Sequence, residues 1–166
     1  TNKTKAISVV HLGGWPIDMD SVMELARKHN LYVIEDCSQA HGAEINNKKV
    51  GSFGNVATWS FCQDKIISTG GEGGMISTNF KKYWLKLWSL KDHGKNYQSV
   101  FHKKHNTGFK WLHEEIGSNY RMTEMQAAIG KNMLNLLDKQ IKKRNLIANL
   151  YLKELKKYFK KINIFK

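Results

Sequence analysis

Lys65 lies between two segments that together could present an amine to a flat ligand. An apolar run at residues 56–61 precedes it, and a glycine-rich turn at residues 70–74 follows it. A lysine between a buried strand and a turn without bulky side chains can face an enclosed pocket while a ligand approaches the backbone. Burial favours the neutral amine, the form that condenses with a carbonyl to give a Schiff base. The alternative is an ordinary loop lysine, in a chain with 27 Lys and Arg residues.

A second candidate group follows the short apolar stretch at residues 31–34. Asp36 stands where this strand is expected to end, and ligands of open parallel sheets bind beyond the carboxyl ends of the strands. An aspartate there can hold a cationic ring nitrogen, and Gln39 is close enough in sequence to reach another edge of the same ring. Asp36 alone would more commonly be a cap or an ion-pair partner. Together with a Schiff-base lysine, however, it forms the arrangement that pyridoxal phosphate (PLP) chemistry requires.

The elements that position these residues read as an α/β unit. Strands are expected at residues 6–11, 31–35, 56–61 and 74–78, and a helix core is expected at residues 83–90. An earlier helix should follow Pro16, with Asp18 or Asp20 as its cap; Ser21 and Glu24 also have capping-box spacing. Its buried stripe is expected to contain Val22, Leu25 and Ala26. The strand–helix–strand order predicts a parallel pair of strands.

A helical pattern runs from Thr123 to about Phe159 without a proline. Its apolar residues recur at three- and four-residue steps: Met125, Ala128, Ile129, Met133, Leu136, Leu137 and Ile141. This pattern predicts one long helix, or two joined end to end. It should bury one stripe against the sheet or a second subunit.

Residues 98–116 show no clear periodicity and are expected to form a loop. His102, His105 and His113 lie in this segment, but their spacing fits no standard zinc pattern and no cysteine accompanies them. No metal site is therefore expected.

The net charge of +13 raises the possibility of nucleic-acid binding. The basic residues cluster late, at residues 139–144 and 153–161, where they alternate with apolar residues at helical spacing. We interpret them as solvated helix faces, and the aromatic residues show no stacking pattern. No apolar run is long enough for a membrane span. Cys37 and Cys62 lack CxxC spacing and are expected to be reduced thiols of a cytoplasmic protein.

Six ordered segments, beginning near residue 11 and ending near residue 128, give the chain a family resemblance. They are residues 11–20 (HLGGWPIDMD), 34–43 (IEDCSQAHGA), 60–65 (SFCQDK), 70–74 (GGEGG), 93–94 (HG) and 117–128 (GSNYRMTEMQAA). The chain resembles the DegT/DnrJ/EryC1/StrS family of PLP-dependent sugar aminotransferases. The resemblance implies the α/β large domain of the aspartate-aminotransferase type (fold type I).

Individual roles follow from the resemblance where the residues match. Lys65 would bind the cofactor aldehyde, Asp36 the pyridine nitrogen, Gln39 the ring near its 3-hydroxyl, and Ser60 the phosphate. Asn119 would reach the phosphate of the neighbouring subunit's cofactor. His41 and His93 also match family positions, without an assigned role. The sequence departs from the family at Cys37, where alanine is common, and at residues 62–64, where the change could alter how Lys65 is presented.

The resemblance implies transfer of an amino group from an amino acid such as glutamate to a nucleotide-linked keto-sugar, in amino-sugar or surface-polysaccharide synthesis. The enzyme would be a cytoplasmic homodimer with a shared active site. Members are much longer than this chain, which is expected to be a fragment. Residues 1–122 would be part of the PLP-binding domain, and residues 123–166 would lead toward the small C-terminal domain. An upstream phosphate-binding helix and a ring-stacking side chain would be missing.

Three alternatives remain at this point. A sugar dehydratase of the same family would carry histidine in place of the Schiff-base lysine, so Lys65 argues against it. An inactive or structural remnant would keep the fold without turnover. A basic nucleic-acid-binding module would show strongly salt-dependent affinity.

Overall fold

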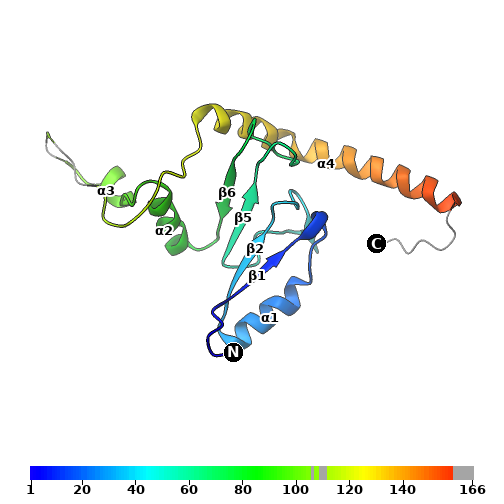
Figure 1. Cartoon of the computed structure of the whole chain (residues 1–166), viewed down its shortest axis with the longest axis horizontal. Helices are drawn as coiled ribbons and strands as arrows, with labels where there is room; N and C mark the ends of the chain where they lie inside the picture. The colour runs from blue at the N-terminus through cyan, green and yellow to red at the C-terminus, as the bar shows by residue number, and fades with distance from the viewer. Residues whose placement is uncertain (106, 109–111, 159–166) are drawn as a thin grey trace.

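A computed structural model describes residues 1–105, 107–108 and 112–158. Its centre is a four-stranded sheet in the order β1-β2-β5-β6 (Figure 1). The strands are β1 (Ala6–Val10), β2 (Tyr32–Asp36), β5 (Val56–Ser60) and β6 (Gly74–Ser77). The first three run parallel, and β6 is antiparallel to β5. The expected strands and the parallel β1–β2 pair are confirmed.

Helix α1 (Met19–His29) connects β1 to β2 and covers one face of this end of the sheet. Asp18 is its N-cap, and one carboxylate oxygen accepts the Ser21 N–H at 3.2 Å. Met19 and Ala26 are buried against Val9 and Val33 of the sheet. This stripe confirms the expected burial of Ala26, but Leu25 is outside it and remains 49% exposed. The sheet contacts the face through Met19 and Ala26, seven residues apart, and Leu25 points away from that face.

A small hairpin between β2 and β5 was not expected from the sequence. Strands β3 (Glu44–Ile45) and β4 (Lys48–Lys49) pair antiparallel, with Asn46 and Asn47 both at positive φ in the turn. Two consecutive left-handed residues are typical of a two-residue hairpin turn, and asparagine tolerates this conformation. The hairpin leads into residues 51–54, whose backbone N–H groups turn toward β2.

The expected second helix is present as α2 (Lys81–Lys91), but the loop expected after it contains the short helix α3 (Tyr97–Phe101). The Asn96 side chain accepts the Ser99 N–H at 3.0 Å and thereby caps α3. Tyr97 packs edge-on against Trp84 and Trp88 of α2, with ring centroids 4.9 and 5.1 Å away. The prediction of a featureless loop was therefore wrong at this end, because contacts with α2 stabilise a helix that periodicity alone does not indicate. Part of the predicted loop, residues 106 and 109–111, lies outside the described residues.

Helix α4 (Glu124–Tyr158) is a single continuous element, as one of the two expected arrangements required. Figure 1 shows it passing the ends of β5 and β6 and then continuing beyond the sheet. None of its described side chains is fully buried. The half-buried positions are Gln126, Gly130, Met133, Leu137, Gln140, Ile141 and Leu152. The predicted stripe is half-buried at Met133, Leu137 and Ile141, whereas Met125, Ala128, Ile129 and Leu136 are exposed in the single chain. Burial of these four against a second subunit, the other expected arrangement, stays a prediction.

A cavity of about 460 Å³ separates the first half of α4 from the sheet. Its walls include the apolar side chains of Trp59, Phe61, Met75, Leu134 and Leu137. Gly42 sits at one side, at φ +81°, where a Cβ would overlap the Ile141 side chain of α4. In the described part of the chain, no helix has the length and apolar character that crossing a membrane requires.

Candidate active site

The carboxyl ends of β2 and β5 lie side by side and carry the predicted polar residues. Asp36 is the last residue of β2 and pairs in register with Thr58 of β5, two residues before Ser60. Because the two strands are parallel, Asp36 and Ser60 emerge at the same edge of the sheet. Lys65 follows β5, and its charge reaches Asp36. The structure therefore brings the two central candidates to one end of the sheet, as predicted.

Asp36 is held as a carboxylate. Its Oδ1 accepts the Ser38 N–H at 2.9 Å. Hydrogen bonds from Ser38 hold the pKa of Asp36 below its usual value, and the positive charge of Lys65 lowers it further. The Ser38 side chain also bonds to this carboxylate. A carboxylate can accept about four hydrogen bonds, so Asp36 keeps the capacity to accept a proton-bearing ring nitrogen beyond the strand end.

Lys65 is largely shielded from solvent, with 19% of its side chain exposed. Its Nζ lies 3.8 Å from Oδ1 of Asp64, and the Cys62 thiol donates to the same oxygen at 2.6 Å. The Lys65 N–H donates to the Cys62 carbonyl at 3.1 Å, which closes the turn after β5. Cys62 and Asp64, two of the residues that depart from the family pattern, therefore form the turn that presents Lys65.

Gln39 and Ser60 lie near this edge with different degrees of restraint. The Gly13 N–H donates to Gln39 Oε1 at 2.7 Å, which leaves the Gln39 amide nitrogen to donate elsewhere. Ser60 Oγ accepts only a long hydrogen bond, 3.5 Å, from the Cys62 N–H. Its hydroxyl can therefore turn toward another acceptor, such as a phosphate oxygen.

Asn119 belongs to a separate cluster at the end of α2. It pairs with Asp92 across an isolated β-bridge, and its Oδ1 accepts from Arg121 Nε at 3.0 Å. Asp92 faces three cations: Lys95 at 3.0 Å, Arg121 at 3.7 Å and Lys91 at 3.8 Å. In the described part of the chain, no contact joins Asn119 to Asp36, Gln39, Ser60 or Lys65.

The two family-matched histidines have different surroundings. His41 is 4% exposed, packs against the rings of Trp59 and Phe61, and lines the cavity beneath α4. Burial lowers the pKa of His41, so its neutral form is favoured. His93 has φ +57°, and its carbonyl lies 2.7 Å from His113 Nδ1. Neither histidine contacts Asp36 directly among the described hydrogen bonds.

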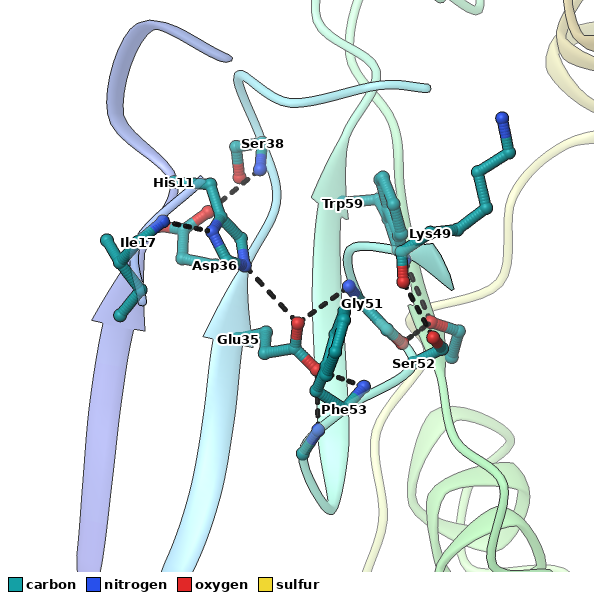
Figure 2. A network of polar contacts seen from close by, with 12 residues as sticks. His11, Ile17, Glu35, Asp36, Ser38, Lys49, Gly51, Ser52, Phe53 and Trp59 are labelled. Atoms are coloured by element: carbon teal, nitrogen blue, oxygen red, sulfur yellow. Dashed lines mark hydrogen bonds and ion pairs between the residues drawn. The ribbon is translucent and has the colours of Figure 1, made fainter. Parts of the chain in front are cut away.

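Sequence reasoning missed the buried pair formed by Glu35 and His11, both 0% exposed. Figure 2 shows the Glu35 carboxylate surrounded by donors from both sides. It accepts the N–H groups of Gly51, Phe53 and Gly54 at 2.7, 2.9 and 2.6 Å, and His11 Nε2 lies 3.2 Å away. The available signal was an acidic residue next to Asp36 inside an apolar strand, but its partners come from two distant segments, His11 and residues 51–54.

Cys37 lies beside this pair, and one potential ligand atom each from His11, Glu35 and Cys37 falls within 4.8 Å of the others. The carboxylate and imidazole atoms are already used in hydrogen bonds. Burial, followed by the nearby Glu35 and Asp36 charges, raises the pKa of the Cys37 thiol to about 12. Because the Glu35 and His11 ligand atoms are already engaged inside the protein, these residues do not offer a free set of metal ligands.

The model of the DegT/DnrJ/EryC1/StrS aminotransferase family matches residues 1–164. The chain is 44% identical over 155 residues to GDP-perosamine synthase of Escherichia coli O157:H7, covering 93% of this chain and 40% of the relative. It is 43% identical over 159 residues to the dTDP-3-amino-3,6-dideoxy-alpha-D-galactopyranose transaminase of Aneurinibacillus thermoaerophilus, covering 96% and 40%.

The solved structure of an aminotransferase from Psychrobacter cryohalolentis matches with a TM-score of 0.82 and 57% identity, over 84% of this chain and 35% of that one. This match confirms the expected α/β fold of PLP-dependent aminotransferases, over part of its length. The chain spans about 40% of the length of the curated relatives. On the agreement of sequence, fold and strand-end residues, the chain belongs to the DegT/DnrJ/EryC1/StrS aminotransferase family.

Proposed function

We propose that this chain forms part of the cofactor domain of a PLP-dependent enzyme that transfers an amino group from an amino acid, with glutamate as the expected donor, to a nucleotide-linked keto-sugar. The observation that carries the proposal is the placement of the ionised Asp36 and the shielded Lys65 at one end of the sheet, within electrostatic reach of each other. The two curated relatives support the substrate class, because their names specify a GDP-linked and a dTDP-linked sugar.

The free valences of the site residues fit PLP. The Asp36 carboxylate can accept the protonated ring nitrogen in addition to its bonds from Ser38, and the amide nitrogen of Gln39 can donate to the 3-oxygen of the ring. The weakly engaged Ser60 hydroxyl can bind the phosphate. These assignments are proposals that rest on hydrogen-bonding capacity. Asn119, in its separate cluster, would complete the phosphate site of a second subunit.

When bound, PLP supplies an aldehyde that condenses with amines and a ring that withdraws electrons from the bond being broken. Lys65 would hold the aldehyde end of the cofactor through its amine. The same amine, when not engaged in this way, could move a proton to and from the substrate carbon. Asp36 would keep the ring nitrogen protonated throughout, because a carboxylate with a lowered pKa stays ionised at neutral pH.

Two alternatives are weighed against this proposal. A sugar dehydratase of the same family would require a residue other than lysine at position 65, so the lysine favours amino transfer. A structural role without turnover would leave the unused valences of Asp36 and Gln39 unexplained. A homodimer with Asn119 shared between subunits, in the cytoplasm, is part of the proposal.

Reductive trapping tests the function directly. The full-length protein is incubated with PLP, treated with borohydride, digested, and searched by mass spectrometry for the lysine that carries the reduced cofactor. We expect the adduct on Lys65 in full-length wild-type protein and no site-specific adduct in Lys65→Ala. Lys86→Ala is a matched control, because Lys86 is exposed and pairs with Glu115 away from the site. An adduct on another lysine would overturn the assignment.

A further inference from the structure

A series of polar contacts leads from the buried Glu35–His11 pair, through the exposed turn that follows His11, to Gln39, and no assigned role accounts for it. We propose that Glu35 and His11 are positioning residues that fix the amide of Gln39 as a hydrogen-bond donor to the ring of the cofactor. This inference rests on the proposed function for the identity of that ring. Three parts of the hydrogen-bond network support it: the Glu35 carboxylate, the His11 ring and the turn that follows His11.

The hydrogen-bond acceptor positions of the Glu35 carboxylate are all occupied. Adjacent strand residues point to opposite faces, so Glu35 points away from the side of Asp36. Oε1 accepts two backbone N–H groups, from Phe53 and Gly54, and Oε2 accepts one from Gly51. The remaining acceptor position on Oε2 faces His11 Nε2 at 3.2 Å (Figure 2). Every acceptor position is then occupied, so the carboxylate is a fixed reference point for the imidazole.

The second part is the His11 ring and its tautomer. The Ile17 N–H donates to His11 Nδ1 at 3.3 Å, so Nδ1 is the unprotonated nitrogen and Nε2 carries the hydrogen that Glu35 accepts. The backbone N–H of His11 also donates to the Asp36 carbonyl at 3.1 Å. His11 is therefore held on both ring nitrogens and on its main chain, next to the residue proposed to bind the ring nitrogen.

The third part is the turn between His11 and Ile17. The His11 ring bonds to the amide of Ile17, so one side chain holds both ends of the turn. Between them, Gly13 adopts φ +62°, a conformation that glycine reaches without strain, and directs its N–H at Gln39 Oε1. The oxygen of the Gln39 amide is thereby fixed in place, and the nitrogen points to the remaining side.

This arrangement decides which end of an amide the cofactor meets. If the turn loosens, the Gln39 amide can rotate and present its oxygen, which would repel the oxygen of the cofactor ring. A hydrogen-bond donor at the ring oxygen would stabilise the negative charge of that oxygen, which then attracts the proton on the nearby Lys65 nitrogen less strongly. Loss of the donor therefore raises the pH at which that nitrogen gives up its proton, and the visible absorption band changes with it.

The first readout needs no cofactor. In the PLP-free protein, amide hydrogen exchange is compared between wild type, Glu35→Gln, His11→Phe and Asp18→Ala. We expect exchange within residues 12–17 to accelerate in Glu35→Gln and His11→Phe, by about tenfold or more at Ile17, because the Ile17 N–H loses the His11 ring as its acceptor or that ring loses its anchor at Glu35. The backbone bonds from Gly14 and Trp15 remain, so the other amides of the turn should change less. Asp18→Ala is the matched control: it removes the cap of the neighbouring helix and should accelerate exchange at Ser21 instead. Unchanged protection of residues 12–17 in His11→Phe would overturn the proposal.

The second readout is a double-mutant cycle on the PLP-loaded protein. His11→Phe and Gln39→Ala should each shift the pH midpoint of the visible band upward, and the double variant should shift it no further than Gln39→Ala alone. Additive shifts would show that His11 acts independently of Gln39 and would overturn the proposal, as would a shift of equal size in Asp18→Ala. If wild-type protein takes up no PLP, the proposed function fails, while the exchange readout still decides whether His11 holds the turn.

Discussion

The end of β2 and the end of α2 use charge in opposite ways. At the end of β2, the Glu35 carboxylate is completely buried, and each of its bonds is made inside the chain. At the end of α2, Asp92 is surrounded by three cations, and Arg121 remains 46% exposed. In the first region, residues of this chain alone supply every hydrogen-bond partner of the buried carboxylate. The second presents excess positive charge outward, as a surface does when its partner comes from elsewhere.

This contrast suggests that the two regions contribute to active sites of different subunits. Residues near the buried network, Asp36, Gln39 and Lys65, should work within the subunit that carries them. Residues in the exposed cluster, Asn119 above all, should work on a site completed by another subunit. The predictions below test whether the two regions differ in this way.

The largest effect is expected from Lys65→Ala. Without the amine, neither covalent attachment of the cofactor nor proton transfer to C4′ is possible, and general acid–base catalysis alone contributes about 10²–10⁴-fold. The full-length enzyme should therefore lose at least that factor in transamination rate, while its melting temperature changes little. Steady-state kinetics and thermal unfolding measure the two quantities. A variant with near-normal turnover would remove Lys65 from the mechanism.

Asp36→Asn should reduce the rate of the first half-reaction by about 10²–10³-fold, the range seen when a group that stabilises developing charge is removed. Binding of PLP should weaken less, because the lysine and phosphate contacts remain. The pKa of Asp36 is lowered on folding, so its contribution to stability is present above the unfolded pKa and is lost as the pH falls through the folded value. Any stability difference from wild type should thus disappear only in acid.

The two regions should also differ in how much the loss of one carboxylate lowers the free energy of unfolding. Glu35→Ala leaves one buried and two partly buried backbone N–H groups without an acceptor and should cost about 3 kcal/mol in the free energy of unfolding. Glu115 pairs with Lys86 near the second region and is 40% exposed, so Glu115→Ala should cost about 1 kcal/mol or less. Urea denaturation of both variants measures the difference. Equal losses would contradict the contrast between a buried and a surface network.

The smallest signal is a partial recovery on mixing subunits. A Lys65→Ala chain and an Asn119→Ala chain are each impaired alone. In a hybrid dimer with shared sites, one site holds both defects and the other holds neither. Equal mixing under exchange conditions should then restore about a quarter of the wild-type sites, since half of the dimers are hybrids. If Asn119→Ala is impaired alone and mixing restores nothing, Asn119 does not act across a subunit boundary.

Local patterns predicted the parts of the fold that depend on neighbours in sequence. Apolar runs identified β1, β2, β5 and β6. Asp18 was one of two expected caps of α1, and the structure selects it over Asp20. The Asn46-Asn47 turn of the hairpin carried a local signal that was overlooked.

What the sequence could not show depends on contacts between distant segments. The α3 helix is stabilised by tryptophans of α2. The half-buried face of α4 depends on contacts of Gly130 with Thr69 and of Ile141 with Gly42, which are distant in sequence. The strand-end position of Asp36 and Lys65 was predictable because parallel strands end at one edge. The Glu35–His11 pair was not, because its carboxylate takes donors from loops 16 to 24 positions away.

The length of α4 has a mechanical consequence. Its first half touches the sheet domain up to Ile141, and nearly all residues from 142 to 158 are exposed. At 1.5 Å per residue, those residues project about 25 Å as one stiff rod without a proline to bend it. A tilt of about 10° at the base would displace the tip by about 4 Å over that length. The packing of Gly42 against Ile141 and of Gly130 against Thr69 thus fixes the angle between α4 and the sheet. That angle determines the position of whatever is attached to the far end of the helix.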